Sequence, residues 1–295
     1  MKFALVGGYH DDNSLALARS CIIRAEELGY DIFTVGDHYI NPFSNWHLDA
    51  WTYLGYAAAT TKSIKIGTLV TPIPLRSPAI LAKVVASLDV LSEGRVMLGV
   101  GAGYVPEEFK AYSQWDEAGV RVSKTLEGLD LMRRLWTGQQ VNFRGKYYSS
   151  TGGVCLPEPR QKPHPQLWFG SSQPRMMRAL ARFGQGWIPG SLPPEVWREK
   201  WKELLSTASE FGRKDQIEGG STLVVADGMR PQDVPLSARD PSKLDKAVVN
   251  MKQSVKRIEE YAEAGVSSIF VFLFPTLRYT ELMQVFAKEI IPSFR

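Results

Sequence analysis

Two neighbouring residues, Asp37 and His38, are the strongest candidates for acid–base chemistry in this sequence. They follow residues 31–35, a short apolar run that is typical of a buried strand. An imidazole can donate or accept a proton near neutral pH, and the adjacent carboxylate can accept a hydrogen bond from a cofactor amide or hydroxyl. The alternative is structural: Asp37 would cap a local turn and His38 would be a satisfied core residue. A position just after a strand favours the functional interpretation.

The segment Gly170-Ser171-Ser172-Gln173-Pro174 is a second candidate site. Glycine permits a turn, serine hydroxyls and backbone N–H groups can point outward, and proline suits the first position of a helix. The amino terminus of a helix favours an anion, and Arg175 and Arg178 add positive charge nearby. These features predict a phosphate site. The competing interpretation is ordinary helix capping by Ser172.

Three alternating glycines, Gly99, Gly101 and Gly103, have spacing unlike that of the dinucleotide fingerprint, because the third glycine arrives too early. Together with Ala102 they would keep the floor of a site low enough for a flat ring to approach the backbone. Close packing between a strand and a helix would explain the same glycines equally well.

The elements that must position these residues alternate between short β-rich runs and longer amphipathic stretches. Strands are expected at residues 3–6, 31–35, 64–70, 95–100, 166–169, 186–188, 221–226 and 268–274. Helices are expected at residues 14–28, 48–61, 78–91, in a long region ending near Trp136, and at 174–183, 195–211, 244–264 and 280–290. Eight strand–helix pairs predict an α/β fold, a (β/α)8 TIM barrel, in one domain over residues 1–295.

An open, doubly wound sheet is the alternative fold. Its dinucleotide fingerprint would be expected at the first strand–helix turn, which here is Gly7-Gly8-Tyr9-His10-Asp11-Asp12. Two insertions interrupt the barrel pattern. They are a hairpin at residues 141–148, after the fourth helix and with Arg144-Gly145 at its turn, and a Pro-rich loop at residues 228–241, after the seventh strand.

The composition bounds the class of protein. A chain of 295 residues with 44% hydrophobic and 22% charged residues can order a core, and the scattered 25 Gly and 18 Pro exclude a collagen-like sequence. A formal net charge of +4 without a basic stripe argues against a nucleic-acid partner. No apolar run approaches the roughly 20 residues that span a bilayer, and the start of the chain turns polar too soon for a signal peptide.

A metal centre is not predicted, because the four histidines share no ligand spacing and the two cysteines, Cys21 and Cys155, show none either. So few cysteines suit a reducing compartment. We therefore expect a cytoplasmic enzyme with a small-molecule substrate, no metal, no nucleic acid and no membrane partner.

Beyond these patterns, the chain resembles the bacterial luciferase-like superfamily of flavin- and deazaflavin-dependent oxidoreductases. The likeness covers nearly the whole chain and is densest from Leu48 to Gly138. The motifs that carry it are Leu48-Asp49-Ala50-Trp51, Gly67-Thr68-Leu69-Val70-Thr71-Pro72, Arg76-Ser77-Pro78-Ala79, Leu81-Ala82-Lys83, Leu88-Asp89-Val90-Leu91-Ser92-Glu93-Gly94-Arg95, Leu98-Gly99-Val100-Gly101-Ala102-Gly103, Leu135-Trp136-Thr137-Gly138, Pro163-His164-Pro165 and Gly186-Trp187. The family fold is a TIM barrel with insertions, in agreement with the pattern of elements.

The resemblance implies a tricyclic ring at the carboxyl face of the barrel. A bulge after the third strand, with a non-proline cis peptide expected at Thr68–Leu69, would back this ring, and Ala102-Gly103 would flank it. Gly170-Ser171-Ser172 would hold the cofactor phosphate. Asp37 would contact the polar edge or side chain of the ring, while His38 would face the reacting atom as proton donor or acceptor. Of the aromatic residues, Tyr39, Trp46 and Tyr104 are placed to touch a flat ring.

The Asp-His pair and the compact length are more similar to the coenzyme F420 branch, because FMN-dependent monooxygenases of the family often carry a Glu-His-His pattern in that loop. The resemblance implies an F420-dependent oxidoreductase that transfers a hydride between the deazaflavin and a small organic substrate. An FMN-dependent monooxygenase using reduced flavin and O2 is the alternative, and a non-redox phosphate-binding lyase or isomerase is a remote one.

The chain also departs from part of that branch. Sugar-phosphate dehydrogenases of the F420 branch have a glutamate where this chain has Tyr104, which argues against glucose 6-phosphate as the substrate. The methylene-tetrahydromethanopterin reductase branch and other F420 reductases stay open. A homodimer is implied by the family resemblance alone.

Overall fold

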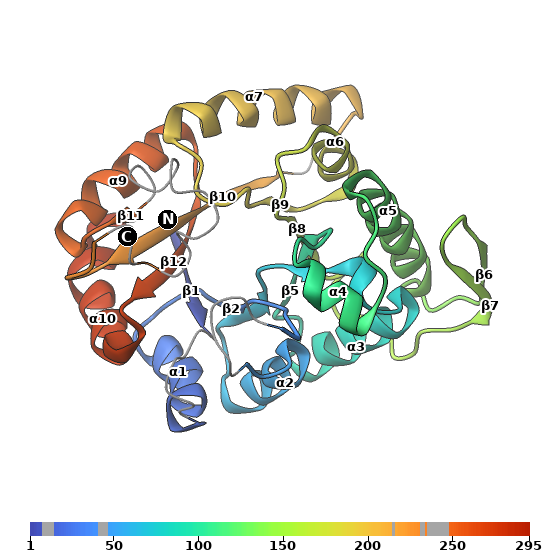
Figure 1. Ribbon diagram of the computed structural model, residues 1–295, viewed down its shortest axis with the longest axis horizontal. Helices are drawn as coiled ribbons and strands as arrows, with labels where there is room; N and C mark the ends of the chain where they lie inside the picture. The colour runs from blue at the N-terminus through green and yellow to red at the C-terminus, as the bar shows by residue number, and fades with distance from the viewer. Residues whose placement is uncertain (8–14, 41–46, 214–215, 231–233, 235–247) are drawn as a thin grey trace.

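The computed structural model describes residues 1–7, 15–40, 47–213, 216–230, 234 and 248–295. Eight parallel strands close into a barrel within these residues, because β10 pairs with both β12 and β9. In their order around the barrel the strands are β12 (Ser268–Phe274), β1 (Lys2–Gly7), β2 (Ile32–Val35), β3 (Lys65–Thr68), β5 (Val96–Gly101), β8 (Gln166–Phe169), β9 (Gly186–Trp187) and β10 (Glu218–Ala226). The predicted (β/α)8 TIM barrel is confirmed (Figure 1).

A helix follows each barrel strand, and these helices form the outer ring (Figure 1). They are α1 (Leu15–Glu27), α2 (Ala50–Thr60), α3 (Pro78–Leu91), α5 (Ala118–Leu135), α6 (Pro174–Phe183), α7 (Pro194–Glu210), α9 (Met251–Ala264) and α10 (Tyr279–Val285). Each buries an apolar stripe against the strands, as Leu81 and Val85 of α3 show. None of the helices in the described part of the chain combines the length and apolar character needed to span a membrane.

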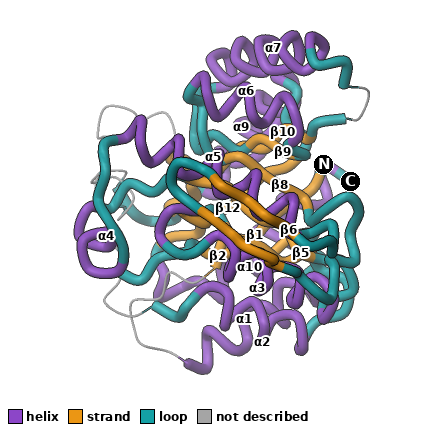
Figure 2. Tube along the Cα trace, turned by 90° about the vertical axis from the view of Figure 1, so that its right-hand side faces the viewer, coloured by secondary structure: helices purple, strands orange, loops and turns teal. Residues whose placement is uncertain are grey.

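Short elements complete the fold. They are β4 (Thr71–Pro72), which pairs with β5, β11 (Val248–Val249), which pairs with β10, the helix α4 (Pro106–Tyr112), and helical turns at Ile73–Leu75, Thr276–Arg278, Phe286–Ile290 and Ile291–Phe294. Figure 2 places α4 at one end of the barrel and both chain ends at the other. At that second end the ammonium group of Met1 donates a hydrogen bond to the carbonyl of Phe294 at 3.2 Å.

Four predicted elements have the observed bounds, namely α3, β8, α6 and β12. The predicted start of the helix 244–264 is wrong. The helix α9 begins at Met251, because Asn250 and Gln253 form a capping box in which each side chain accepts from the backbone N–H of the other at 3.0 Å. The β-branched pair Val248–Val249 extends the sheet as β11, and residues 244–247 lie outside the described part.

The predicted hairpin insertion is confirmed, with strands β6 (Val141–Arg144) and β7 (Ser149–Gly153) projecting beside the barrel (Figure 1). Its second strand begins later than expected, because the turn is longer than Arg144-Gly145. Backbone N–H groups of residues 146–148 donate to the carboxylate of Glu127 on α5 at 2.7–3.0 Å, which stabilises the longer turn. The predicted loop at residues 228–241 lies mostly outside the described residues.

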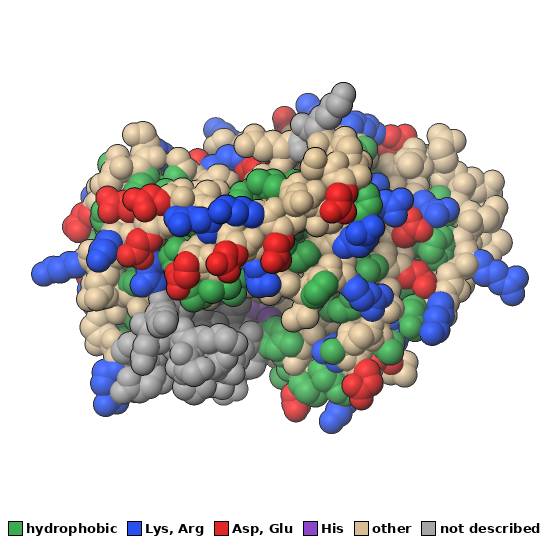
Figure 3. Space-filling view, turned by 90° about the horizontal axis from the view of Figure 1, so that it is seen from above, with side chains coloured by type: hydrophobic (Ala, Val, Ile, Leu, Met, Phe, Trp, Pro, Cys, Tyr) green, Lys and Arg blue, Asp and Glu red, His purple; other side chains and the backbone are tan. Residues whose placement is uncertain are grey.

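Side chains of both charge signs are interspersed over the face in Figure 3, and the described atoms of that face form no broad field of one sign. Such a surface differs from the basic stripe that is typical of nucleic-acid binding. A small net charge of +4 accompanies it.

Trp168 of β8 occupies the interior of the barrel, where its ring packs edge-on against Phe270 with centroids 5.5 Å apart. Glycines on β9 and β10, the next two strands around the barrel, make room for this indole. A Cβ at Gly186 would lie 2.1 Å from the ring of Trp168, and one at Gly220 would lie 3.0 Å away. At this level of the interior, one large side chain is therefore accommodated by two residues that have no side chain, as close packing requires.

We expect Gly186→Ala to lower the free energy of unfolding by about 1–3 kcal/mol or more, because the added methyl overpacks the barrel against Trp168. Urea denaturation of the two proteins measures the difference. Gly55→Ala is the control: a Cβ at Gly55, inside α2, meets nothing within 4 Å, and alanine should stabilise the helix by about 1 kcal/mol. Equal changes in the free energy of unfolding for the two substitutions would contradict the packing of Trp168 against Gly186 described above.

Candidate active site

A cavity of about 440 Å³ opens at the carboxyl ends of the barrel strands. This is the face where barrels assemble their catalytic groups, and the volume lies in the range of small-molecule sites, about 300–1,000 Å³. The residues that line it are His38, Leu69, Val70, Pro72, Gly101, Ala102, Gly103, Tyr104, Ala118, Arg121, Val122, Gly170, Ser171, Gln173, Met176, Ile188, Pro189, Gly190, Thr222 and Phe272.

The structure brings most of the predicted site residues to this cavity. Those that line it are His38, Leu69, Ala102, Gly103, Gly170 and Ser171. Asp37, Thr68 and Ser172 are not part of the lining. Trp46 and His10 lie outside the described residues, and Tyr39 also lies away from the lining, with its hydroxyl accepting a hydrogen bond from Arg76 at 3.0 Å.

Asp37 is fully buried, and its carboxylate accepts hydrogen bonds from other side chains. Both terminal nitrogens of the Arg76 guanidinium donate to it, at 2.5 and 2.8 Å. The hydroxyl of Thr71 donates at 2.8 Å and the indole N–H of Trp51 at 3.2 Å. Burial alone would lower the pKa of Arg76, but the hydrogen bonds and charge of Asp37 outweigh it and raise that pKa. The structure thus makes Asp37 an anchor for its neighbours, whereas the sequence suggested contact with a ring.

The bulge after β3 carries a non-proline cis peptide, as expected, but at Leu69–Val70 and not at Thr68–Leu69. The N–H of Leu69 donates to the carbonyl of Val35 at 2.8 Å, so pairing with β2 continues through this residue and the bulge begins after it. Thr68 is buried behind the bulge, where its hydroxyl oxygen accepts from the N–H of Gly99 at 3.2 Å.

Glycines on the neighbouring strands make room for the side chain of Val70. A Cβ at Gly99, Gly101 or Gly170 would lie 3.0, 2.5 or 2.7 Å from a methyl group of Val70. At Gly99 and Gly101 the close packing is therefore against the bulge after β3 and not against a helix. At Gly103 the expected packing against a helix is found, because a Cβ there would lie 2.3 Å from the ring of Phe109 on α4. The result is a low, apolar cavity floor made of Val70 and backbone, which a flat ring can approach.

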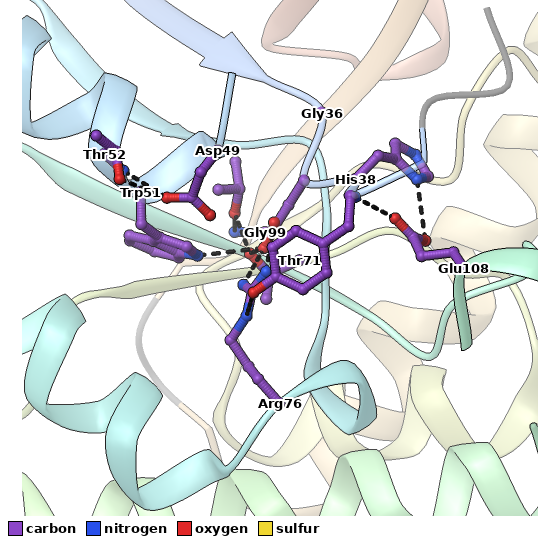
Figure 4. A network of polar contacts seen from close by, with 12 residues as sticks. Gly36, His38, Asp49, Trp51, Thr52, Thr71, Arg76, Gly99 and Glu108 are labelled. Atoms are coloured by element: carbon purple, nitrogen blue, oxygen red, sulfur yellow. Dashed lines mark hydrogen bonds and ion pairs between the residues drawn. The ribbon is translucent and has the colours of Figure 1, made fainter. Parts of the chain in front are cut away.

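His38 is buried between two partners, one on each ring nitrogen. Its Nδ1 lies 3.2 Å from Oε2 of Glu108, and its Nε2 lies 3.1 Å from the hydroxyl of Tyr104. Figure 4 shows Glu108 reaching His38 from the side of α4. The other carboxylate oxygen of Glu108 accepts from the backbone N–H groups of Tyr39 and of Ile40, the latter at 3.2 Å.

Glu108 is kept ionised by these contacts. Burial would raise the pKa of its carboxyl, but the hydrogen bond and charge of His38 and the two backbone donors outweigh burial and lower it. An ionised carboxylate only accepts hydrogen bonds, so Nδ1 of His38 carries a hydrogen. Its Nε2, on the cavity side, is then the nitrogen that can exchange a proton.

The other end of the cavity suits an anion. Gln173 precedes α6 without a side-chain cap on the helix, and its N–H donates to the hydroxyl of Ser171 at 3.2 Å. Helix capping by Ser172, the competing interpretation of this segment, is therefore not found. The nearby cation is Arg121, which lines the cavity and donates to the carbonyl of Gly103 at 3.3 Å. Arg175 instead donates to Gly119 and Ser123 of α5.

Arg178, the other arginine expected at this anion site, lies over the ring of Phe211 at 4.9 Å. The sequence interpretation thus missed Arg121, Arg76 and the role of Glu108. For Glu108 a usable signal existed, since it follows Tyr104 by four residues beyond a barrel strand. Within the described part of the chain, no three His, Cys, Asp or Glu side chains are grouped to hold a metal ion.

Comparison with known proteins identifies the family, because residues 2–234 match luciferase-like monooxygenases. The chain belongs to the luciferase-like monooxygenase family. Among curated relatives in the family, the F420-dependent glucose-6-phosphate dehydrogenase of Beutenbergia cavernae is 34% identical over 92% of this chain and 91% of its own. The enzyme of that name from Microbacterium testaceum is 27% identical over 92% of this chain and 91% of its own.

Solved structures confirm the luciferase-like barrel. The monooxygenase RslO1 from Streptomyces bottropensis has a TM-score of 0.85 at 22% identity and covers 100% of both chains. An F420-dependent secondary alcohol dehydrogenase in complex with an F420–acetone adduct has a TM-score of 0.84 at 22% identity, with 100% of this chain and 99% of that chain covered. The family resemblance inferred from the motifs is confirmed.

Glu108→Gln should lower the free energy of unfolding at pH 7 by about 1–3 kcal/mol, because it removes a charged, buried hydrogen-bond acceptor. The pKa of Glu108 in the folded protein lies below its ordinary value of 4.5. Its stabilisation is therefore complete above pH 4.5 and is lost as the pH falls through the lowered pKa. The difference between variant and wild type should shrink with acidification, as measured by urea denaturation across this range.

Its neighbour provides the control for this prediction. Glu107 is exposed on the same turn of α4, so Glu107→Gln should change stability by no more than about 0.5 kcal/mol at any pH. A difference between wild type and Glu108→Gln that grows on acidification would contradict the assigned role.

Proposed function

We propose that the protein is an F420-dependent oxidoreductase that transfers a hydride between the deazaflavin and a small organic substrate. One observation carries the proposal: a single cavity joins an apolar, glycine-bounded floor at Leu69–Val70 to a buried His38 held by Glu108. The names of the curated relatives, F420-dependent glucose-6-phosphate dehydrogenases, support the choice of cofactor.

The residues present fit a flat tricyclic ring with a phosphate-bearing side chain. Leu69 and Val70 would back the ring, and Ala102 and Gly103 would flank it. At the other end of the cavity, Gly170 and Ser171 with the uncapped amino terminus of α6 would hold the phosphate, and Arg121 would supply positive charge. In this arrangement Asp37 and Thr68 would not touch the cofactor but would hold the cavity floor in place through their hydrogen bonds to Thr71 and Gly99. Ser172 would only connect Ser171 to the start of α6.

F420, when bound, would supply a ring carbon that gives or takes a hydride. The side chains of the cavity provide the rest. Apolar walls such as Ile188 and Phe272 exclude water from the reacting carbons. His38 would hold or move a proton at Nε2, and Glu108 keeps its ring in the required orientation.

Titration of the purified protein with F420 and with FMN, followed by absorption and fluorescence, tests this proposal. We expect F420 to bind at least ten times more tightly than FMN. Arg121→Ala should weaken F420 binding by about 10–100-fold, which corresponds to one hydrogen bond to a charged group. Arg175→Ala is the control, because its guanidinium bonds to α5. Tight binding of FMN without binding of F420 would favour a flavin-dependent monooxygenase instead.

We also propose that the chain acts as a single domain and as a homodimer in the cytoplasm. The dimer is supported by an exposed apolar stripe on α3, formed by Ile80, Val84 and Leu91. It is extended by Val154 and Leu156, whose carbonyl accepts a hydrogen bond from Lys83 of α3. Contiguous apolar surface of this kind is typical of an interface, and a two-fold axis would bury it in both copies. A reducing location is supported by two buried, unbridged cysteines.

Light scattering coupled to size exclusion should give twice the 33.0 kDa of one chain. The double variant Ile80→Lys and Leu91→Lys should elute as a monomer, because it would place charges in the shared apolar stripe. Leu277→Lys is the control, since Leu277 is equally exposed but follows β12 outside the stripe. A monomeric wild type, or a dimer that survives the double substitution, would contradict this interface.

A further inference from the structure

Tyr104 and His38 both line the cavity, and the hydroxyl of Tyr104 lies within hydrogen-bond distance of the His38 ring. We propose that its hydroxyl exchanges a proton directly with a carbonyl or hydroxyl oxygen of the substrate, and that His38 relays this proton. The inference rests on the proposed function, because it assigns the proton step that must accompany hydride transfer. It also names the substrate class, namely carbonyl compounds and the corresponding alcohols.

The geometry brings Tyr104 to the reaction side of the histidine. It follows β5, lines the cavity and is 45% exposed, whereas His38, which also lines the cavity, is 9% exposed. Its hydroxyl lies 3.1 Å from Nε2 of His38, and the two rings meet edge-on at 5.6 Å. A phenol oxygen has one hydrogen to donate and two lone pairs to accept. Tyr104 can therefore bond to His38 and to a substrate oxygen at the same time.

The hydrogen bond with Glu108 determines which ring nitrogen of His38 can exchange a proton with Tyr104. The carboxylate of Glu108 accepts from Nδ1 of His38 at 3.2 Å and also accepts from two backbone N–H groups. These contacts fix the orientation of the imidazole ring. The exchangeable proton of His38 is then the one on Nε2, which faces Tyr104. Glu108 is a positioning residue, and Tyr104 is the catalytic residue of the three.

The protons and electrons balance in both directions. In carbonyl reduction, the carbonyl carbon gains a hydride from the reduced cofactor and forms a C–H bond. The electron pair of the broken C=O π bond takes the hydroxyl proton of Tyr104, and the phenol oxygen takes the Nε2 proton of an imidazolium His38. The products are an alcohol, the oxidised cofactor, neutral His38 and neutral Tyr104. Alcohol oxidation runs through the same transfers in reverse.

The surroundings of Tyr104 indicate what the rest of the substrate looks like. The lining contributed by Val70, Ile188, Pro189 and Phe272 is apolar. A substrate whose oxygen is held by Tyr104 would share the cavity with this apolar lining, which favours hydrocarbon substituents. Cyclohexanol and 2-butanol are suitable probes, since each has one hydroxyl and an apolar body.

The first test measures reduction of F420 by these two alcohols with wild type, Tyr104→Phe, His38→Gln and Tyr112→Phe. We expect Tyr104→Phe and His38→Gln to lose about 10²–10⁴-fold in turnover, while F420 affinity changes less than about threefold. Tyr112, the last residue of α4, packs against Tyr39 with ring centroids 4.8 Å apart and is not part of the cavity lining, so Tyr112→Phe should turn over normally.

Turnover of Tyr104→Phe within threefold of wild type would overturn the inference. So would a wild type that binds F420 but oxidises neither alcohol. Failure to bind F420 at all would instead overturn the proposed function, so the two failures are distinguishable.

A second test needs no cofactor. In the NMR spectrum of the protein with ¹⁵N-labelled histidine, Tyr104→Phe should shift the Nε2 resonance of His38, and Tyr112→Phe should leave it in place. Glu108→Gln should shift the Nδ1 resonance of the same ring. If the Nε2 resonance of His38 has the same chemical shift in Tyr104→Phe as in wild type, the hydrogen bond between Tyr104 and His38 is not formed and the proposed proton relay is wrong.

Discussion

The buried ion pair between Asp37 and Arg76 is the constraint on which the rest of the site depends. A carboxylate with no exposure to solvent is several kcal/mol unfavourable unless its oxygens are fully matched by donors. Here Trp51 comes from α2, Thr71 from β4 and Arg76 from the segment before α3, so one charge ties three elements to the end of β2. His38 is the next residue along the chain, and its backbone position follows from that anchor.

The same ion pair fixes the floor of the cavity. Thr71 donates to Asp37 and directly follows Val70, the residue that fills the space left by Gly99, Gly101 and Gly170. The bulge after β3 is therefore held from one side by a hydrogen bond to a buried charge and from the other by packing against backbone. Because both contacts are short-range and specific, the distance and orientation between the cavity floor and His38 are fixed.

The barrel was predictable because its signals are local. Buried parallel strands are apolar runs, and the outer helices have the period of an amphipathic helix, so β8, α6 and β12 were predicted with their observed bounds. His38 was found through its position after a strand. The role of Asp37 was not, because a carboxylate next to a histidine can face a ligand or a buried arginine, and only tertiary contacts decide. The position of Glu108 after a barrel strand could have marked it as a candidate, but its partner His38 lies 70 positions away and only the tertiary contact identifies it.

The distribution of polar groups in the cavity determines the orientation in which a cofactor can bind. His38 and Tyr104 lie after β2 and β5, whereas Ser171, Gln173 and Arg121 lie where β8 leads into α6 and where α5 begins. An anionic tail next to His38 would sit beside the ionised Glu108, which repels it, while the positive end of α6 and Arg121 attract it. The reacting edge of a flat ring is thereby turned toward the histidine by charges that take no part in the reaction.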